Sequence, residues 1–103
     1  MAANVVDNPA AGRFEIYADG ELAGFAAYHR DGATITFTHT EVDLRFEGHG
    51  YGSALARGAL DAVRVEGLAV LPVCPFIQGY LQRHPDDVDL VPAGERARFG
   101  LIA

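Results

Sequence analysis

Apolar and polar residues alternate along the first part of the chain in a pattern that predicts strands. In residues 13–18, Phe14 and Ile16 fall on one face and polar side chains fall on the other, as in a half-buried strand. The pair Asp19-Gly20 that follows is a strong signal for a tight hairpin turn. The sequence therefore predicts a strand over residues 13–18 that turns back on itself.

Two further strands are expected at residues 21–29 and 33–42. The second of these alternates four threonines with a face made of Ile35, Phe37, His39 and Glu41. Together the three segments predict an antiparallel meander. Residues 1–11 show no clear period, and we expect them to form an extended or frayed lead-in.

After residue 50 the spacing of apolar residues changes to that of a helix. The apolar positions are Leu55, Ala59, Ala62 and Val63. The opposite face is polar, with Arg57 and Asp61 four residues apart, a spacing at which side chains on a helix can pair. Gly67 is placed to end this helix.

The second half of the chain contains one more strand and one more helix. Residues 68–73 are continuously apolar, as in a strand covered on both faces, with Pro72 at an edge or a break in pairing. Pro75 suits the first turn of a helix over residues 75–83, which His84-Pro85 would end. Residues 86–103 are polar apart from an apolar patch at 88–91 and give no clear element.

The resulting order is three strands, a helix, a strand and a helix. A right-handed crossover through the first helix would place the strand at 68–73 parallel to the strand at 33–42. We therefore predict an α/β (α+β) fold: a mixed sheet with an antiparallel N-terminal meander, followed by α-β-α. At 103 residues, with no repeat or linker, residues 1–103 fit a single domain.

The composition narrows the classes of function. The net charge is −6, and all 8 basic residues are arginine; this disfavours nucleic-acid binding, which needs clustered basic residues, and suits a cationic amine substrate. No segment reads as a membrane span or a signal peptide, so we expect a cytoplasmic protein. The single cysteine, Cys74, excludes an internal disulfide.

The segment from Glu47 to Gly52 alternates three glycines with other residues directly before the helix. Glycines let the backbone adopt positive φ and approach a ligand, and a helix N-terminus attracts phosphate. The absence of lysine excludes a Walker-type loop. A dinucleotide site is disfavoured because no acidic residue stands on the strand at 68–73. These features predict a pyrophosphate-containing cofactor of another kind.

Residues 42–55, Val-Asp-Leu-Arg-Phe-Glu-Gly-His-Gly-Tyr-Gly-Ser-Ala-Leu, resemble the acetyl-CoA motif of the GNAT N-acetyltransferase superfamily. Its core is Gln/Arg-x-x-Gly-x-Gly/Ala, and aligning the glycines places Glu47, Gly50 and Gly52 at its first, fourth and sixth positions. Glu47 departs from the usual Gln or Arg. A register that starts at Arg45 also fits but leaves Gly52 unused.

A second resemblance covers about residues 13–91. The segments His39-Thr40-Glu41-Val42 and Val73-Cys74-Pro75-Phe76, with Tyr80 and His84-Pro85, resemble a short single-domain branch of that superfamily with a cysteine proposed as catalytic. The resemblance implies a GNAT-like fold, acetyl-CoA or CoA as cofactor, and pyrophosphate contacts from the glycine loop. It also implies that Glu41 and Val42 lie along the pantetheine arm.

Four side chains are candidates for catalysis. Cys74 precedes a helix N-terminus, which favours the nucleophilic thiolate, and could carry the acetyl group; the alternative is a buried apolar cysteine. Glu41 continues the face of Ile35 and Phe37 as a candidate general base, unless that face simply becomes exposed. His39 could orient Glu41 or Cys74. The resemblance implies that Tyr80 protonates the departing CoA thiolate, whereas its spacing also fits core packing.

The sequence thus predicts an acetyl-CoA-dependent N-acetyltransferase with an amine acceptor, acting through an acetyl-cysteine or directly. The alternative is a non-catalytic CoA or acyl-CoA-binding module. Neither a metal, nor nucleic acid, nor a membrane is expected as a partner, and the chain could act as a monomer or a homodimer. His49 and Tyr51 are expected to shape the loop rather than to react. The predicted cofactor-binding residues are Val42, Glu47, Gly48, His49, Gly50, Tyr51, Gly52, Ser53 and Phe76.

Overall fold

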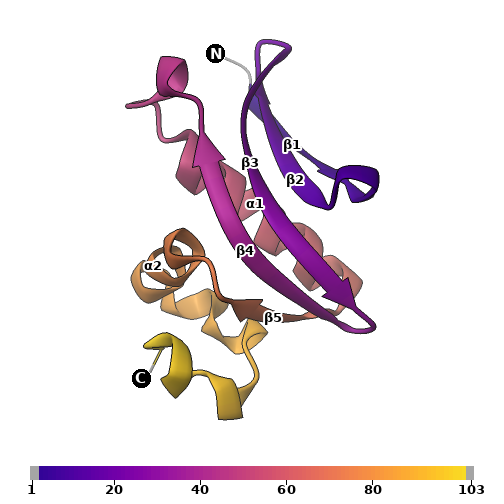
Figure 1. Ribbon diagram of the computed structural model, residues 1–103. Coiled ribbons are helices and arrows are strands. Elements are labelled where there is room, and N and C mark those ends of the chain that lie inside the picture. The colour runs from indigo at the N-terminus through magenta and orange to yellow at the C-terminus, as the bar shows by residue number, and fades with distance from the viewer. Residues whose placement is uncertain (1–2, 102–103) are drawn as a thin grey trace.

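The computed structural model describes residues 3–101 and confirms the mixed α+β architecture. A five-stranded sheet has the order β1-β2-β3-β4-β5, in which β1 to β4 are antiparallel neighbours and β5 is parallel to β4 (Figure 1). The strands are β1 Ala3–Asn8, β2 Arg13–Ala18, β3 Glu21–Asp31, β4 Thr34–Val42 and β5 Ala69–Pro72. The helices are α1 Tyr51–Glu66 and α2 Pro75–Arg83. The crossover through α1 makes β4 and β5 parallel, as predicted.

The N-terminal segment is more regular than the extended or frayed lead-in that we expected. Residues Ala3–Asn8 form β1, which pairs with β2 along its whole length, and Pro9–Ala11 form a 3-10 turn. Val5 packs so closely on α1 that a Cβ on Gly58 would lie 2.7 Å from its side chain. The sequence hid this edge strand because most of its side chains are exposed and show no alternation.

The β2–β3 turn has the conformation that Asp19-Gly20 predicted. Both residues have positive φ, 49° and 85°, as in the type I′ turns that match the twist of a hairpin. Gly67 likewise ends α1 in the left-handed conformation, with its N–H donating to the carbonyls of Val63 and Arg64. The signals for these two chain reversals were therefore local and sufficient.

The core lies between α1 and one face of the sheet, which we call the inner face. Helix α1 contacts β1, β2, β3 and β4, and Figure 1 shows it behind the sheet. The side chains buried between them include Phe14, Ile16, Ile35, Phe37, Leu55, Ala59, Leu60 and Val63. Burial of this apolar surface is the main stabilising term for a domain of this size.

The opposite, outer face of the sheet is organised around a buried carboxylate. Glu15 is only 4% exposed and accepts hydrogen bonds from Arg13 Nε at 2.7 Å, Tyr17 OH at 2.9 Å and Asn8 Nδ2 at 3.3 Å. The Arg13 guanidinium also lies 4.7 Å from the ring of Phe25. The hydrogen bond from Arg13 holds the pKa of Glu15 below its usual value, against the effect of burial.

Strand β5 is shorter than the expected strand at 68–73, and it is an edge strand that ends at Pro72. Val70 and Pro72 are fully buried but Ala69 and Leu71 are only partly so, which means that β5 is covered better on one face than on the other. After α2 the chain forms 3-10 turns at Pro85–Leu90, Ala93–Glu95 and Ala97–Phe99. The buried Leu90, Val91, Phe99 and Leu101 anchor this last segment.

Candidate functional site

The glycine loop leads directly into α1. Gly48 and Gly50 have φ of 83° and 73°, a conformation that favours glycine. Gly50 is the N-cap of α1, so no side chain caps the first turn, and that turn carries no acidic residue. The first N–H groups of a helix lack intrahelical partners and form the positive end of the helix dipole. This N-terminus is therefore suited to a negatively charged group.

Gly52 brings the two helices together. A Cβ on Gly52 would lie 2.8 Å from Cζ of Phe76, so the ring of Phe76, the second residue of α2, packs directly on the first turn of α1. Phe76 remains 37% exposed. The contact places the N-termini of both helices side by side, and only glycine leaves room for it.

A pocket of about 260 Å³ opens at this junction. Eight of the nine predicted cofactor-binding residues line it, namely Val42, Glu47, Gly48, Gly50, Tyr51, Gly52, Ser53 and Phe76. The ninth, His49, lies exposed and stacks on Tyr51 with the ring centroids 5.5 Å apart. Phe46 also lines the pocket and packs on Tyr51 at 5.9 Å. The sequence interpretation missed Phe46, although it is the apolar residue just before the loop.

Strands β4 and β5 separate beside this pocket. Their pairing ends at Phe37↔Pro72, and one further hydrogen bond joins Cys74 N–H to the Phe37 carbonyl at 2.8 Å. The chain then turns into α2, so β5 pairs with none of residues 38–42 of β4. The inner side of residues 38–42, which have β3 but not β5 as a neighbour, faces the start of α2.

Cys74 lies at this separation, as the N-cap of α2 before Pro75. Its Sγ atom is 3.2 Å from Oγ1 of Thr40, which joins β4 to the start of α2. Cys74 is only 2% exposed. The strand expected to end at Cys74 ends at Pro72 instead, and Cys74 follows two residues later beside β4. The structure adds Thr40, which the sequence interpretation did not single out.

A β-bulge in β4 overturns the predicted face of His39 and Glu41. Ala27 pairs with His39 but Tyr28 pairs with Phe37, so Thr38 is an extra residue in β4. An extra residue reverses the alternation that follows it. Phe37 points into the core, but the side chains that continue its face are Thr40 and Val42, both partly buried. The expectation that His39 and Glu41 share a face with Ile35 and Phe37 is therefore wrong.

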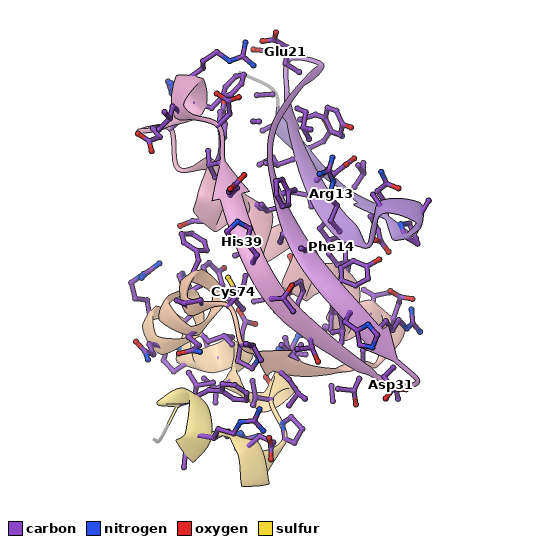
Figure 2. All side chains as sticks on the ribbon, viewed as in Figure 1. Arg13, Phe14, Glu21, Asp31, His39 and Cys74 are labelled. Carbon is purple, nitrogen blue, oxygen red and sulfur yellow. The ribbon has the colours of Figure 1, made fainter. Side chains whose placement is uncertain are left out.

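His39 and Glu41 instead lie together on the outer face. His39 Nε2 is 3.2 Å from Glu41 Oε1, with the side chains 58% and 65% exposed. The His39 ring lies 6.0 Å from that of Phe25, and Figure 2 shows Cys74 beside the part of β4 that carries His39. Of the two roles considered for His39, this geometry fits the orientation of Glu41, whereas Cys74 contacts Thr40.

Tyr80 occupies a different position from the other candidates. It is 3% exposed, it stacks on His84 with the centroids 3.9 Å apart, and burial, followed by the charge of Asp87, raises its pKa. It lines a cleft of about 650 Å³ between α1 and α2 rather than the pocket at the glycine loop. Phe76, expected on the same face, is more exposed and packs on Gly52.

Other classes of site find no counterpart in the part of the chain that the structure describes. Within residues 3–101 no three His, Cys, Asp or Glu side chains converge as metal ligands would. Over the same residues no helix is both long and apolar enough to cross a membrane.

The fold and this pocket define the class of protein. A mixed sheet whose neighbouring parallel strands separate beside the glycine-rich start of the crossover helix is a GNAT-like fold. A model of the GCN5-related N-acetyl-transferase family matches residues 13–90. The chain belongs to this family.

A solved structure supports the same fold. It is the NMR structure of a candidate GCN5-like N-acetyltransferase from Staphylococcus aureus, with a TM-score of 0.65 and 20% sequence identity to this chain. The match covers 86% of this chain and 87% of the other, so the two share the fold over most of their length. A search of curated proteins found no match.

Proposed function

We propose that this chain is an N-acetyltransferase that uses acetyl-CoA and delivers the acetyl group to an amine. The observation that carries the proposal is the pocket at the start of α1, which collects eight residues predicted for the cofactor around an uncapped helix N-terminus. Membership in the GCN5-related family supports the activity in general terms.

The residues of the pocket fit the chemistry of the cofactor. The backbone N–H groups of the first turn of α1 would hold the pyrophosphate. The stretch of β4 that does not pair with β5, up to Val42, with Phe76 opposite, would hold the pantetheine arm. When bound, acetyl-CoA supplies a thioester, whose acetyl group would lie near Thr40 and Cys74, where β4 and β5 separate.

Two routes of transfer make different demands on the protein. In the direct route Glu41, held by His39, accepts a proton from the ammonium group, and the neutral amine nitrogen forms a bond to the acetyl carbon. The carbon–sulfur bond breaks, CoA leaves as a thiolate, and this thiolate takes up the second proton that the nitrogen loses as it becomes an amide. In the covalent route the Cys74 thiol loses its proton and its sulfur forms the bond to the acetyl carbon, while CoA leaves as a thiolate that takes up a proton. A neutral amine then forms a bond to the acetyl carbon, the bond to the Cys74 sulfur breaks, and the proton that the nitrogen loses returns to Cys74. The covalent route requires the 2% exposed thiol to be uncovered.

Mass spectrometry of intact protein mixed with acetyl-CoA separates the two routes. An acetyl group on Cys74 that disappears on addition of an amine supports the covalent route, and a Cys74→Ala protein that keeps full activity excludes it. Glu41→Gln should lower kcat/KM for an amine by about 10²–10⁴-fold if Glu41 is the base. Glu21→Gln, an exposed carboxylate elsewhere on the sheet, is the matched control.

The alternative is a module that binds CoA or acyl-CoA without turnover. It is favoured by the position of His39 and Glu41, which lie exposed on the outer face and do not line the pocket at the glycine loop. If acetyl-CoA binds but no amine in a broad panel of small molecules and peptides is acetylated, the module is the correct function. Gly50→Asp should abolish binding in either case, and unchanged affinity in that variant would contradict the assignment of the loop.

A further inference from the structure

A large cleft lies next to the glycine loop but outside it. This cleft of about 650 Å³ separates α1 from α2 and the 3-10 turn that follows α2. Ser53 lines both the cleft and the pocket at the glycine loop, so the two hollows are adjacent. None of the catalytic roles considered above, apart from Tyr80, involves the cleft.

Two arginines line this cleft, and both differ from the other arginines of the chain. Arg13, Arg30, Arg45, Arg64 and Arg98 form ion pairs, and Arg96 donates to the Val91 carbonyl. Arg57 and Arg83 form no ion pair or hydrogen bond with the residues that the structure describes. The spacing of Arg57 and Asp61 suggested a pair along the helix, but no such ion pair forms within that part of the chain.

The charges in the cleft are arranged along its length. Arg57 stands one helical turn beyond Ser53 on α1. The Arg83 side chain folds back along α2, with Nη1 3.4 Å from where a Cβ on Gly79 would be, toward the end at which the two helices meet. Asp61 lies a turn further along α1. Asp86 and Asp87 follow the end of α2 at the far end of the cleft, and Asp87 is paired with Arg64 at 3.2 Å.

The cleft as a whole holds two guanidinium groups and three carboxylates. At the end next to the glycine loop, Arg57 and Arg83 lie on facing walls and have no acidic partner at ion-pair distance within residues 3–101, so this end forms a local site for an anion. Guanidinium groups bind phosphate through paired, charge-assisted hydrogen bonds. The ribose of CoA carries the pyrophosphate on one side and a phosphomonoester, the 3′-phosphate, on the other. A pyrophosphate at the start of α1 would therefore have its phosphomonoester within one sugar of the cleft.

We propose that Arg57 and Arg83 form a second phosphate site that binds the 3′-phosphate of CoA and makes the protein select CoA over dephospho-CoA. The stacked pair of Tyr80 and His84 forms part of the cleft wall beside it. This inference rests on the proposed function, because it requires the pyrophosphate to be held at the glycine loop.

Calorimetric titration with CoA and with dephospho-CoA tests the site directly. The wild-type protein should bind CoA about tenfold more tightly than dephospho-CoA, as a charge-assisted contact in a solvated cleft would give. The Arg57→Gln/Arg83→Gln protein should bind both ligands with the affinity of the wild type for dephospho-CoA. Arg30→Gln, which removes the same charge from an exposed ion pair with Glu66, should keep the full preference. Each single variant should keep part of it, which provides the test if the double variant fails to fold.

Each other outcome has a definite meaning. If both ligands bind the wild type equally, or if the preference survives in the double variant, the cleft is not the site and the proposed function is unaffected. If inorganic phosphate binds in a manner that depends on Arg57 and Arg83 while the two ligands stay indistinguishable, the cleft takes a free anion, and the inference is wrong. If neither ligand binds, the proposed function fails and this inference fails with it.

Discussion

The inner face of the sheet carries Phe14 and Phe37 beneath α1, whereas the outer face carries Glu15 and Arg13, and no helix of residues 3–101 crosses it (Figure 1). On the inner face, stability comes from apolar surface removed from water. On the outer face, a carboxylate with three hydrogen-bond donors fills the centre. The contrast shows how a sheet with helices on one side can remain ordered on the other while leaving His39 and Glu41 accessible.

The largest loss of stability is expected when a large apolar side chain is removed from the inner face. Phe37→Ala should lower the free energy of unfolding by about 3–5 kcal/mol, because Phe37 is fully buried and its loss leaves a cavity. The matched change on the outer face is Phe25→Ala, which removes a half-buried ring and should cost clearly less. Chemical denaturation of the two variants measures the difference, and equal losses would contradict the distinction between the faces.

The outer face has its own weak point at Glu15. Glu15→Gln should lower the free energy of unfolding by about 1–3 kcal/mol, because the amide cannot accept from Arg13, Tyr17 and Asn8 as the carboxylate does. Glu21→Gln, at an exposed position on β3, should change it by less than about 0.5 kcal/mol. If Glu15→Gln lowered the free energy of unfolding as little as Glu21→Gln does, the network would not stabilise the outer face.

The same network predicts a sensitivity to acid. The pKa of Glu15 is lowered in the folded protein, chiefly by the hydrogen bond from Arg13, so its contribution is complete above the unfolded value of about 4.3 and is lost as the pH falls through the folded value. The difference in unfolding free energy between wild type and Glu15→Gln should be constant near neutral pH and shrink below about pH 4.3. A difference that grows with acidity would reverse the sign and refute this account.

The inner face should respond at the alkaline end instead. Burial raises the pKa of Tyr28 to about 12, with help from its hydrogen bond to Asp7. A raised folded pKa gives stability that is present below the unfolded value of about 10 and is lost as the pH rises through the folded one. Wild type should therefore lose stability above about pH 10 relative to Tyr28→Phe. Parallel denaturation curves for the two proteins between pH 8 and 12 would be inconsistent with this burial.

Only a small effect on stability should come from Glu41. Its side chain is 65% exposed and, among residues 3–101, forms an ion pair with His39 alone, and exposed pairs contribute about 0–1 kcal/mol. Glu41→Gln should therefore unfold almost as the wild type does, at the same denaturant midpoint. A large loss would show that Glu41 supports the outer face as Glu15 does, and would weaken its use as a probe of catalysis.

Local signals in the sequence were enough for most of the fold. Asp19-Gly20, Gly67 and Pro75 act through the backbone of their own residues, so the turn and the helix ends could be predicted from them. The pairing of β1 could not, because an edge strand with exposed side chains has no periodicity to reveal it.

The candidate site divides in the same way. The residues of the glycine loop are contiguous, and the pocket therefore contains almost all of them. The faces of β4 could not be predicted, because a bulge depends on how β3 and β4 pair and leaves no mark in a run of alternating threonines. The roles of Cys74, Glu41, His39 and Tyr80 remain predictions, now with Thr40, Arg57 and Arg83 beside them.

The extra residue at Thr38 acts as a phase shift in an otherwise periodic strand. Before the bulge the odd-numbered residues of β4 face α1, and after it the even-numbered residues do. The position of the bulge therefore decides which residues belong to each face of the sheet. Moving it two residues toward the C-terminus would turn His39 inward and leave Glu41 outward. An engineer could therefore change which side chains of β4 lie on the outer face by moving the bulge, without changing those side chains.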